Sequence, residues 1–205
     1  MSTLGVLLAG GRGERLAQEK PKALARCAGV TLLARAMTTL SAACDSVVVV
    51  APGDMALPVE PRQRVADPAG ASGPLGALVA GLGAHPFDEA LVLSVDLPLV
   101  TPALLAALRA LRGDDAALVP APGGIPQPLA AWYAPQALAR LARALEAGEH
   151  SVTRAVLELA PTLVEDALLA TLPGGLAAWL NVNTPGDLAE AERRLAACSP
   201  RLGPA

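Results

Sequence analysis

Few aromatic side chains and no excess of positive charge characterise this sequence of 205 residues. Phe, Trp and Tyr make up 2% of the chain, and 16 Lys and Arg stand against 19 Asp and Glu, which gives a formal net charge of −3 at pH 7. Proteins that bind nucleic acid use cationic surfaces for the phosphates and often aromatic rings for single-stranded bases. The composition therefore argues against nucleic acid as a partner.

Cysteines and long apolar runs are also scarce. The three cysteines, Cys27, Cys44 and Cys198, lack metal-binding spacing, and an odd, scattered set argues against a disulfide framework. Although 53% of the residues are hydrophobic, Pro, Gly or charged residues interrupt every apolar stretch before it could span a membrane. The N-terminus lacks the basic region and cleavage site of a signal peptide. We expect a cytoplasmic protein that has no membrane segment.

Alternating strand and helix patterns predict a doubly wound α/β fold. Apolar runs predict strands at residues 3–8, 46–51, 90–95 and 116–119, and helical periodicity predicts helices at 32–40, 75–84 and 103–111. This alternation requires a mainly parallel sheet with helices on both faces, and such sheets bind ligands at the carboxyl ends of their strands. The remainder predicts a strand at 129–133 and helices at 136–147, 152–159 and 186–197, after a Pro- and Gly-rich loop.

A glycine-rich loop follows the first predicted strand and gives the strongest chemical signal. It reads LAGGRGERL at residues 8–16 and is followed by KPKAL at residues 20–24. Glycines let backbone N–H groups approach phosphate oxygens, and Arg15 and Lys22 supply positive charge that stabilises a phosphate during transfer. The loop and its cations favour a bound nucleoside triphosphate. A plain glycine turn with solvated basic residues is the alternative.

Two familiar nucleotide-binding loops are excluded. A Walker loop ends in Gly-Lys-Ser/Thr, whereas Glu14 and Arg15 follow Gly13 here. A dinucleotide fingerprint needs a third glycine that opens a helix, and this chain has Leu16 at that position. It also needs an acidic residue near the end of the second strand, which here ends in residues 51–52 (Ala-Pro). An oxidoreductase that uses a dinucleotide is therefore disfavoured.

The loop resembles the signature of nucleotidyltransferases that activate phosphorylated substrates with a nucleoside triphosphate. Four further segments resemble the molybdenum cofactor guanylyltransferase family and follow its order along the chain. They are GPLGAL at 73–78, VDLP at 95–98, PQPL at 126–129 with WY at 132–133, and NVNTP at 181–185 with DL at 187–188. The resemblance therefore covers nearly the whole chain.

The resemblance implies that the terminal phosphate of molybdopterin attacks the α-phosphorus of Mg-GTP, so that pyrophosphate leaves and a guanine dinucleotide cofactor forms. It implies catalytic roles for Arg15, Lys22 and Asp96, with Asp96 as the ligand of Mg²⁺, a cation that prefers carboxylate and phosphate oxygens. Asp96 before Pro98 could instead be a turn or cap residue. Enzymes or chaperones that receive the finished cofactor are the further partners implied.

The remaining site residues fall into two groups under the same resemblance. The nucleotide-binding group is Leu8, Ala9, Gly10, Gly11, Lys22, Asp67, Gly73, Pro74, Leu75 and Asp96. The acceptor-substrate group is Pro126, Gln127, Pro128, Asn181 and Asn183. Turns and helix starts could also explain the aspartate, the Gly-Pro pair and the asparagines. On this interpretation a single domain, 1–205, has a nucleotide-binding half at 1–120 and an acceptor half at 121–205.

The first loop departs from the guanylyltransferase pattern, which leaves the substrates open. Gly13, Glu14, Leu16 and Pro21 make it closer to loops of sugar-phosphate and isoprenoid-precursor nucleotidyltransferases, and residues 52–53 (Pro-Gly) replace a common Asn. The alternatives are a cytidylyltransferase for the same cofactor, an enzyme acting on a sugar or another small phosphate, and a non-catalytic nucleotide-binding protein.

Overall fold

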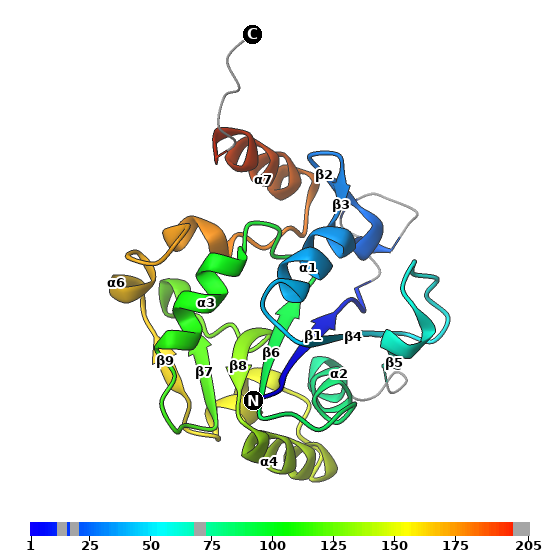
Figure 1. The fold of residues 1–205 in the computed structure, drawn as a ribbon, viewed down its shortest axis with the longest axis vertical. Coiled ribbons are helices and arrows are strands. Elements are labelled where there is room, and N and C mark those ends of the chain that lie inside the picture. Colours follow the sequence, from blue (N-terminus) through cyan, green and yellow to red (C-terminus); the bar gives the residue numbers. More distant parts are fainter. Residues whose placement is uncertain (12–15, 17–20, 68–72, 199–205) are drawn as a thin grey trace, which may run out of the picture.

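A seven-stranded sheet organises the part of the chain that the structure describes, which is residues 1–11, 16, 21–67 and 73–198 of a computed structural model. The strands lie in the order β5-β4-β1-β6-β8-β7-β9, with a small separate β2–β3 hairpin (Figure 1). Their bounds are β1 Thr3–Leu8, β2 Arg26–Cys27, β3 Val30–Thr31, β4 Ser46–Ala51, β5 Arg64–Ala66, β6 Glu89–Ser94, β7 Ala117–Pro120, β8 Ala130–Tyr133 and β9 Thr162–Val164.

Most strand pairs in this sheet are parallel. β1 pairs in parallel with β4 and β6, β4 with β5, and β7 with β9. β8 runs antiparallel to both of its neighbours, β6 and β7. The structure confirms the predicted mainly parallel sheet and adds one reversed strand, so the carboxyl ends of β1, β4, β6 and β7 share one edge with the start of β8.

Helices cover both faces of the sheet, as predicted. The α-helices are α1 Leu32–Ser41, α2 Gly73–Leu82, α3 Pro102–Ala110, α4 Pro135–Glu146, α5 Val152–Leu157, α6 Asp166–Leu169 and α7 Pro185–Cys198, and the 3-10 helices are η2 Lys22–Leu24, η3 Pro61–Gln63, η4 Pro122–Gly124 and η5 Gly175–Trp179. No helix in these described ranges is long and apolar enough to cross a membrane.

Alternating side chains of β1 enter two separate hydrophobic cores. Leu7 packs in one core with buried residues of α1 and α3. Val6 and Leu8 point to the opposite face and pack in a second core with buried residues of α2, α4 and α5. Because β1 lies between two parallel neighbours and both of its faces are covered, it is buried along its whole length, and every residue after Thr3 is apolar.

Side-chain caps fix the starts of two helices that lead away from the sheet. The Thr31 hydroxyl accepts a hydrogen bond from the Ala34 N–H at 3.1 Å, which begins α1 as predicted. The Thr101 hydroxyl does the same for the Leu104 N–H at 3.2 Å, and Pro102 stands in the first turn of α3. These caps satisfy backbone donors that a helix start leaves without partners.

Candidate active site

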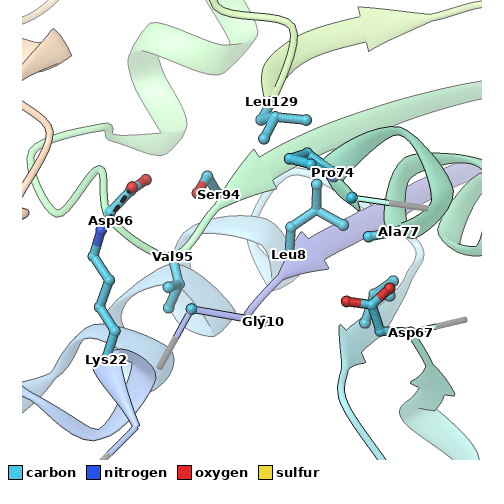
Figure 2. Close-up of a pocket in the computed structure, with 13 residues that line it drawn as sticks. Leu8, Gly10, Lys22, Asp67, Pro74, Ala77, Ser94, Val95, Asp96 and Leu129 are labelled. Atoms are coloured by element: carbon cyan, nitrogen blue, oxygen red, sulfur yellow. Dashed lines mark hydrogen bonds and ion pairs between the residues drawn. The ribbon is translucent and has the colours of Figure 1, made fainter. Parts of the chain in front are cut away.

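A pocket of about 360 Å³ opens where β1, β4 and β6 end. Leu8, Val50 and Ser94 come from these strand ends, and the start of α2 forms another wall. Figure 2 shows Lys22 and Asp96 together on one side of the pocket and Asp67 on the other, with Leu8 and Gly10 between them. The full lining is Leu8, Gly10, Gly11, Lys22, Val50, Asp67, Gly73, Pro74, Ala77, Ser94, Val95, Asp96 and Leu129. The pocket thus lies where ligands of doubly wound sheets bind.

Three polar side chains meet at one end of this pocket. Lys22 Nζ donates hydrogen bonds to Asp96 Oδ2 at 2.9 Å and to Asn183 Oδ1 at 2.7 Å. The Lys22 side chain is 11% exposed and that of Asp96 is 18% exposed, so water screens their ion pair only partly. The structure therefore brings together two predicted catalytic residues and one predicted acceptor residue, which are far apart in sequence.

Backbone hydrogen bonds hold the segments that carry these three side chains. The Lys22 N–H donates to the Gly11 carbonyl at 3.2 Å, which ties η2 to the glycine-rich loop. The Val95 N–H donates to the Leu8 carbonyl at 3.1 Å and extends the β1–β6 pairing toward Asp96. The Val182 N–H in turn donates to the Asp96 carbonyl at 2.9 Å. The cluster thus rests on the central strands of the sheet.

The oxygens of Asp96 fit a divalent cation that also binds phosphate. Oδ2 accepts from Lys22, whereas Oδ1 is buried and has no hydrogen-bond partner. Over the described residues, no group of three or more His, Cys, Asp or Glu could hold a metal ion. Mg²⁺ is commonly bound through one or two carboxylates together with substrate phosphates and water. The donor set therefore suits a cation shared with a bound nucleotide.

Asp67 provides a second carboxylate at the other end of the pocket. Its N–H donates to the Ala51 carbonyl at 3.0 Å, just beyond the pairing of β5 with β4. Partial burial raises the pKa of the Asp67 carboxyl. A Cβ at Gly10 would lie 3.2 Å from Asp67 Oδ2, so glycine at this position leaves room for the carboxylate beside the loop.

The structure places most of the predicted nucleotide-binding residues around this pocket. Those on its lining are Leu8, Gly10, Gly11, Lys22, Asp67, Gly73, Pro74 and Asp96. The side chains of Ala9 and Leu75 are fully buried in the two cores instead, which leaves only their backbone atoms for a ligand. Arg15 lies outside the described residues.

The predicted acceptor residues are divided between two places. Pro126, Gln127 and Pro128 lie in the loop between β7 and β8 and are absent from the pocket lining. There the Gln127 N–H donates to the Pro120 carbonyl at 2.8 Å, and the Pro128 carbonyl accepts from the Tyr133 hydroxyl at 2.7 Å. Neither asparagine is part of the pocket lining: Asn183 contacts the lining residue Lys22, and the half-buried Asn181 lies two residues earlier.

Five lining residues were not among the predicted site residues: Val50, Ala77, Ser94, Val95 and Leu129. Val50, Ser94 and Val95 lie at the ends of predicted strands, so the rule that ligands bind at carboxyl strand ends could have found them. Ala77 and Leu129 lie inside the GPLGAL and PQPL segments of the family resemblance, but their apolar side chains did not single them out as site residues. They reach the pocket because α2 packs on β1 and β4 and because the start of β8 pairs with the end of β6.

A family model described as the MobA-like NTP transferase domain matches residues 5–163. The chain belongs to this family. Among relatives of this MobA-like chain, a protein of Chloroflexus aggregans named "Probable molybdenum cofactor guanylyltransferase" is 38% identical over 193 residues and covers 92% of each chain. A protein of Rhodopseudomonas palustris named "Molybdenum cofactor guanylyltransferase" is 35% identical over 208 residues, which cover 94% of this chain and 93% of that protein.

Solved structures share the fold of the MobA-like chain. Molybdopterin-guanine dinucleotide biosynthesis protein A from Archaeoglobus fulgidus has a TM-score of 0.76 and 24% identity, covering 95% of this chain and 99% of that chain. A 2-C-methyl-D-erythritol 4-phosphate cytidylyltransferase from Thermus thermophilus has a TM-score of 0.68 and 23% identity. The match covers 94% of this chain and 98% of that chain. The predicted family, the α/β fold and the nucleotidyltransferase class are thus confirmed, whereas the roles of single residues stay predictions.

Proposed function

We propose that this MobA-like nucleotidyltransferase acts in molybdenum cofactor biosynthesis and transfers GMP from Mg-GTP to the terminal phosphate of molybdopterin, releasing pyrophosphate. The names of the relatives at 38% and 35% identity support this reaction. The observation that carries the proposal is the arrangement of one pocket, which has the Lys22–Asp96–Asn183 cluster at one end and the Asp67 carboxylate at the other. Enzymes or chaperones that take up the finished cofactor are the further partners that we propose.

The Lys22 end of the pocket suits the triphosphate. A lysine ammonium group has three N–H donors, and the contacts to Asp96 and Asn183 use two of them. The third can bind a phosphate oxygen, and its positive charge stabilises negative charge that grows on the leaving pyrophosphate. Asp96 Oδ1 is the oxygen for Mg²⁺, which when bound would neutralise charge on the phosphates. Arg15, in the same loop sequence, is proposed as a further cation.

The chemical step needs no protein base. An oxygen of the acceptor phosphate forms a bond to the α-phosphorus of GTP, and the bond from that phosphorus to the bridging oxygen of the β-phosphate breaks. The electron pair of that bond leaves with pyrophosphate. Phosphoryl-type transfers of this kind depend mainly on positioning and on stabilisation of charge. Lys22 and Asn183, held in direct contact, would provide that positioning.

The Asp67 end suits a guanine base. A carboxylate accepts two neighbouring N–H groups at once, and guanine presents such a pair, its N1–H and its 2-amino group, on one edge. Adenine and cytosine lack this pair of adjacent donors. Leu8, Pro74 and Leu129 supply apolar surface between the two polar ends of the pocket, against which the faces of a base can pack.

A pyrophosphate-release assay tests the proposal. The purified protein would be incubated with Mg²⁺, molybdopterin and each of GTP, CTP, ATP and UTP, in parallel with Lys22→Met and Asp96→Asn. We expect release with GTP only and a loss of at least about 100-fold in both variants. Asp114→Asn, at an exposed position away from the pocket, is the matched charge control and should keep wild-type activity.

Other outcomes of this assay would contradict the proposal in distinct ways. Release with CTP alone would replace it with a cytidylyltransferase for the same cofactor. Release that requires a sugar phosphate or another small phosphate in place of molybdopterin would change the acceptor. No release with any nucleotide and acceptor, while Mg-GTP still binds, would indicate a non-catalytic nucleotide-binding protein.

A further inference from the structure

The carboxylate of Asp187 holds the backbone on which Asn183 is carried. Asp187 Oδ2 accepts hydrogen bonds from the N–H of Asn183 at 3.0 Å and from the N–H of Thr184 at 2.8 Å. In return, the Thr184 hydroxyl accepts from the Asp187 N–H at 3.2 Å. This reciprocal arrangement is a capping box, and it stands at the start of α7.

The same segment is also attached to the sheet at a point one residue earlier. The Val182 N–H donates to the Asp96 carbonyl at 2.9 Å, and Val182 is fully buried. Asn183 itself is exposed, so packing does little to fix its orientation. With the Val182 anchor on one side, the Asp187 carboxylate supplies the second attachment that determines how the backbone of Asn183 is turned.

The direction of the Asn183 side chain affects the position of the Lys22 ammonium group. Asn183 Oδ1 accepts from Lys22 Nζ at 2.7 Å, which is the shorter of the two contacts of that ammonium group. A lysine side chain is flexible, and its ammonium group can turn to many acceptors. An acceptor at a fixed place limits where the ammonium group and its remaining N–H can point.

The charge state of Asp187 agrees with this chain of contacts. The hydrogen bonds from Asn183 and Thr184, together with the positive charge of Lys22, lower the pKa of the Asp187 carboxyl. The group is therefore ionised at neutral pH, and an ionised carboxylate makes stronger hydrogen bonds to backbone N–H groups than a neutral acceptor does.

We propose that Asp187 is a positioning residue of the transfer reaction, which fixes the backbone of Asn183 so that its amide oxygen orients the Lys22 ammonium group toward the nucleotide phosphates. Asp187 acts through Asn183 and Lys22, three contacts away from the substrate, and is not itself a catalytic residue. The proposal rests on the function proposed above, because it assigns Asp187 to the reaction of that same pocket. A misplacement of a reacting or stabilising group by about 1 Å can slow an enzyme by about 100-fold.

A double-mutant cycle tests whether Asp187 acts through Asn183. Asp187→Ala, Asn183→Ala and the double variant would be compared in steady-state pyrophosphate release. We expect each single substitution to lower kcat by about 10- to 100-fold while the KM for GTP changes by less than about 3-fold. The double variant should be no slower than Asn183→Ala alone, since residues that act through one another are not additive. If the two losses multiply, the proposal is overturned.

Two further variants separate positioning from helix capping. Asp187→Asn keeps an oxygen acceptor at the same place, so it should restore kcat to within about 3-fold of wild type. Thr184→Val removes the other half of the capping box but leaves the carboxylate that binds Asn183. It should lower Tm about as much as Asp187→Ala does and keep kcat within about 2-fold. A kcat that instead follows Tm across all five variants would show that Asp187 is only a helix cap.

Crystal structures test the role of Asp187 without the acceptor substrate molybdopterin. Crystal structures of wild type and Asp187→Ala with Mg²⁺ and a non-hydrolysable GTP analogue need no molybdopterin. If wild type shows no turnover, the proposed function fails, and the position of Asn183 still tests the inference. We expect Asn183 Oδ1 to lie beyond hydrogen-bond distance, about 3.5 Å, from Lys22 Nζ in the variant. An unchanged contact in the variant would overturn the inference.

Discussion

Replacing Gly81 with alanine should destabilise the contact between α2 and the sheet. A Cβ at Gly81 would lie 2.3 Å from Val6 Cγ1 on β1 and 3.0 Å from Val50 Cγ2 on β4. Carbon atoms in favourable contact are about 3.5–4.0 Å apart, so the new methyl group would be more than about 1 Å too close to Val6. Val6 and Val50 are buried and branched, and neither can turn away into solvent.

The size of the effect follows from two opposing contributions. Extra atoms forced into a packed core reduce the free energy of unfolding by about 1–3 kcal/mol, and a contact as short as this one belongs in the upper part of that range. Alanine is favoured over glycine in a helix by about 1 kcal/mol. The net loss is about 1–2 kcal/mol, which for a chain of this size corresponds to a Tm lower by about 2–8 °C.

The same substitution should weaken nucleotide binding. α2 begins at Gly73 and Pro74, which line the pocket, and Val50 lines it as well. Moving α2 outward to relieve the contact would separate these walls. We therefore expect a higher Kd for Mg-GTP in calorimetric titrations of Gly81→Ala, alongside the lower Tm measured by thermal unfolding.

A matched control is available at Gly113, where an added Cβ would meet no atom within 4 Å and φ is not in the left-handed region. Gly113→Ala should keep the unfolding free energy within about 0.5 kcal/mol of wild type. Combining Gly81→Ala with Val6→Ala should cost less than the sum of the two changes, because the shortened Val6 makes room for the methyl group. A Gly81→Ala variant as stable as wild type would refute the packing argument.

Three further predictions concern ionisation, backbone strain and metal. Burial raises the pKa of the Asp67 carboxyl, so the protein loses stability as the pH rises from the ordinary pKa of an aspartate through that raised value. The loss is complete at about pH 7 and largely absent at about pH 3, where the group is mostly protonated in both the folded and the unfolded state. Asp67→Asn should thus raise Tm at pH 7 but not at pH 3, and weaken the preference for GTP; a Tm gain equal at both pH values would contradict this. Ala28 has φ +50°, a left-handed conformation that strains alanine but not glycine, so Ala28→Gly should raise or preserve Tm. Ala196→Gly inside α7 should instead reduce the unfolding free energy by about 1 kcal/mol. Equal losses at both sites would contradict the argument that Ala28 is strained. EDTA should abolish pyrophosphate release and leave the Tm of the nucleotide-free protein unchanged, and a fall in that Tm would indicate a structural metal.

The sequence predicts the central strands well and the edge strands poorly. The predicted ranges 3–8 and 46–51 coincide with β1 and β4, because each is a continuous apolar run that is followed closely by Gly or Pro. β5 and β9 have only three residues each and are partly exposed, so they show neither an apolar run nor alternation. They form strands because β4 and β7 offer them backbone partners, and that information is not local.

The site is predictable at its strand ends and not where distant segments meet. Gly10 and Asp96 follow predicted strands, so their place at the carboxyl edge of the sheet follows from the fold class. The contact between Lys22 and Asn183 joins residues 161 positions apart, and no spacing rule predicts it. Family resemblance selected Asn183 as a site residue, but only the packing of the segment before α7 shows which side chain it contacts.

The place of β8 in the sheet has a consequence for how the chain is made. β8 lies between β6 and β7, although it follows both of them in the sequence. Until residue 133 has left the ribosome, β6 has no neighbour on one edge and β7 has none on the side that β8 will occupy. Unpaired strand edges are templates for aggregation.

At about 5–20 residues per second, the stretch from residue 95 to residue 133 takes about 2–8 s to synthesise. Synonymous codons that slow this stretch would prolong the exposure of an open edge. They should therefore lower the yield of soluble protein without changing a single amino acid.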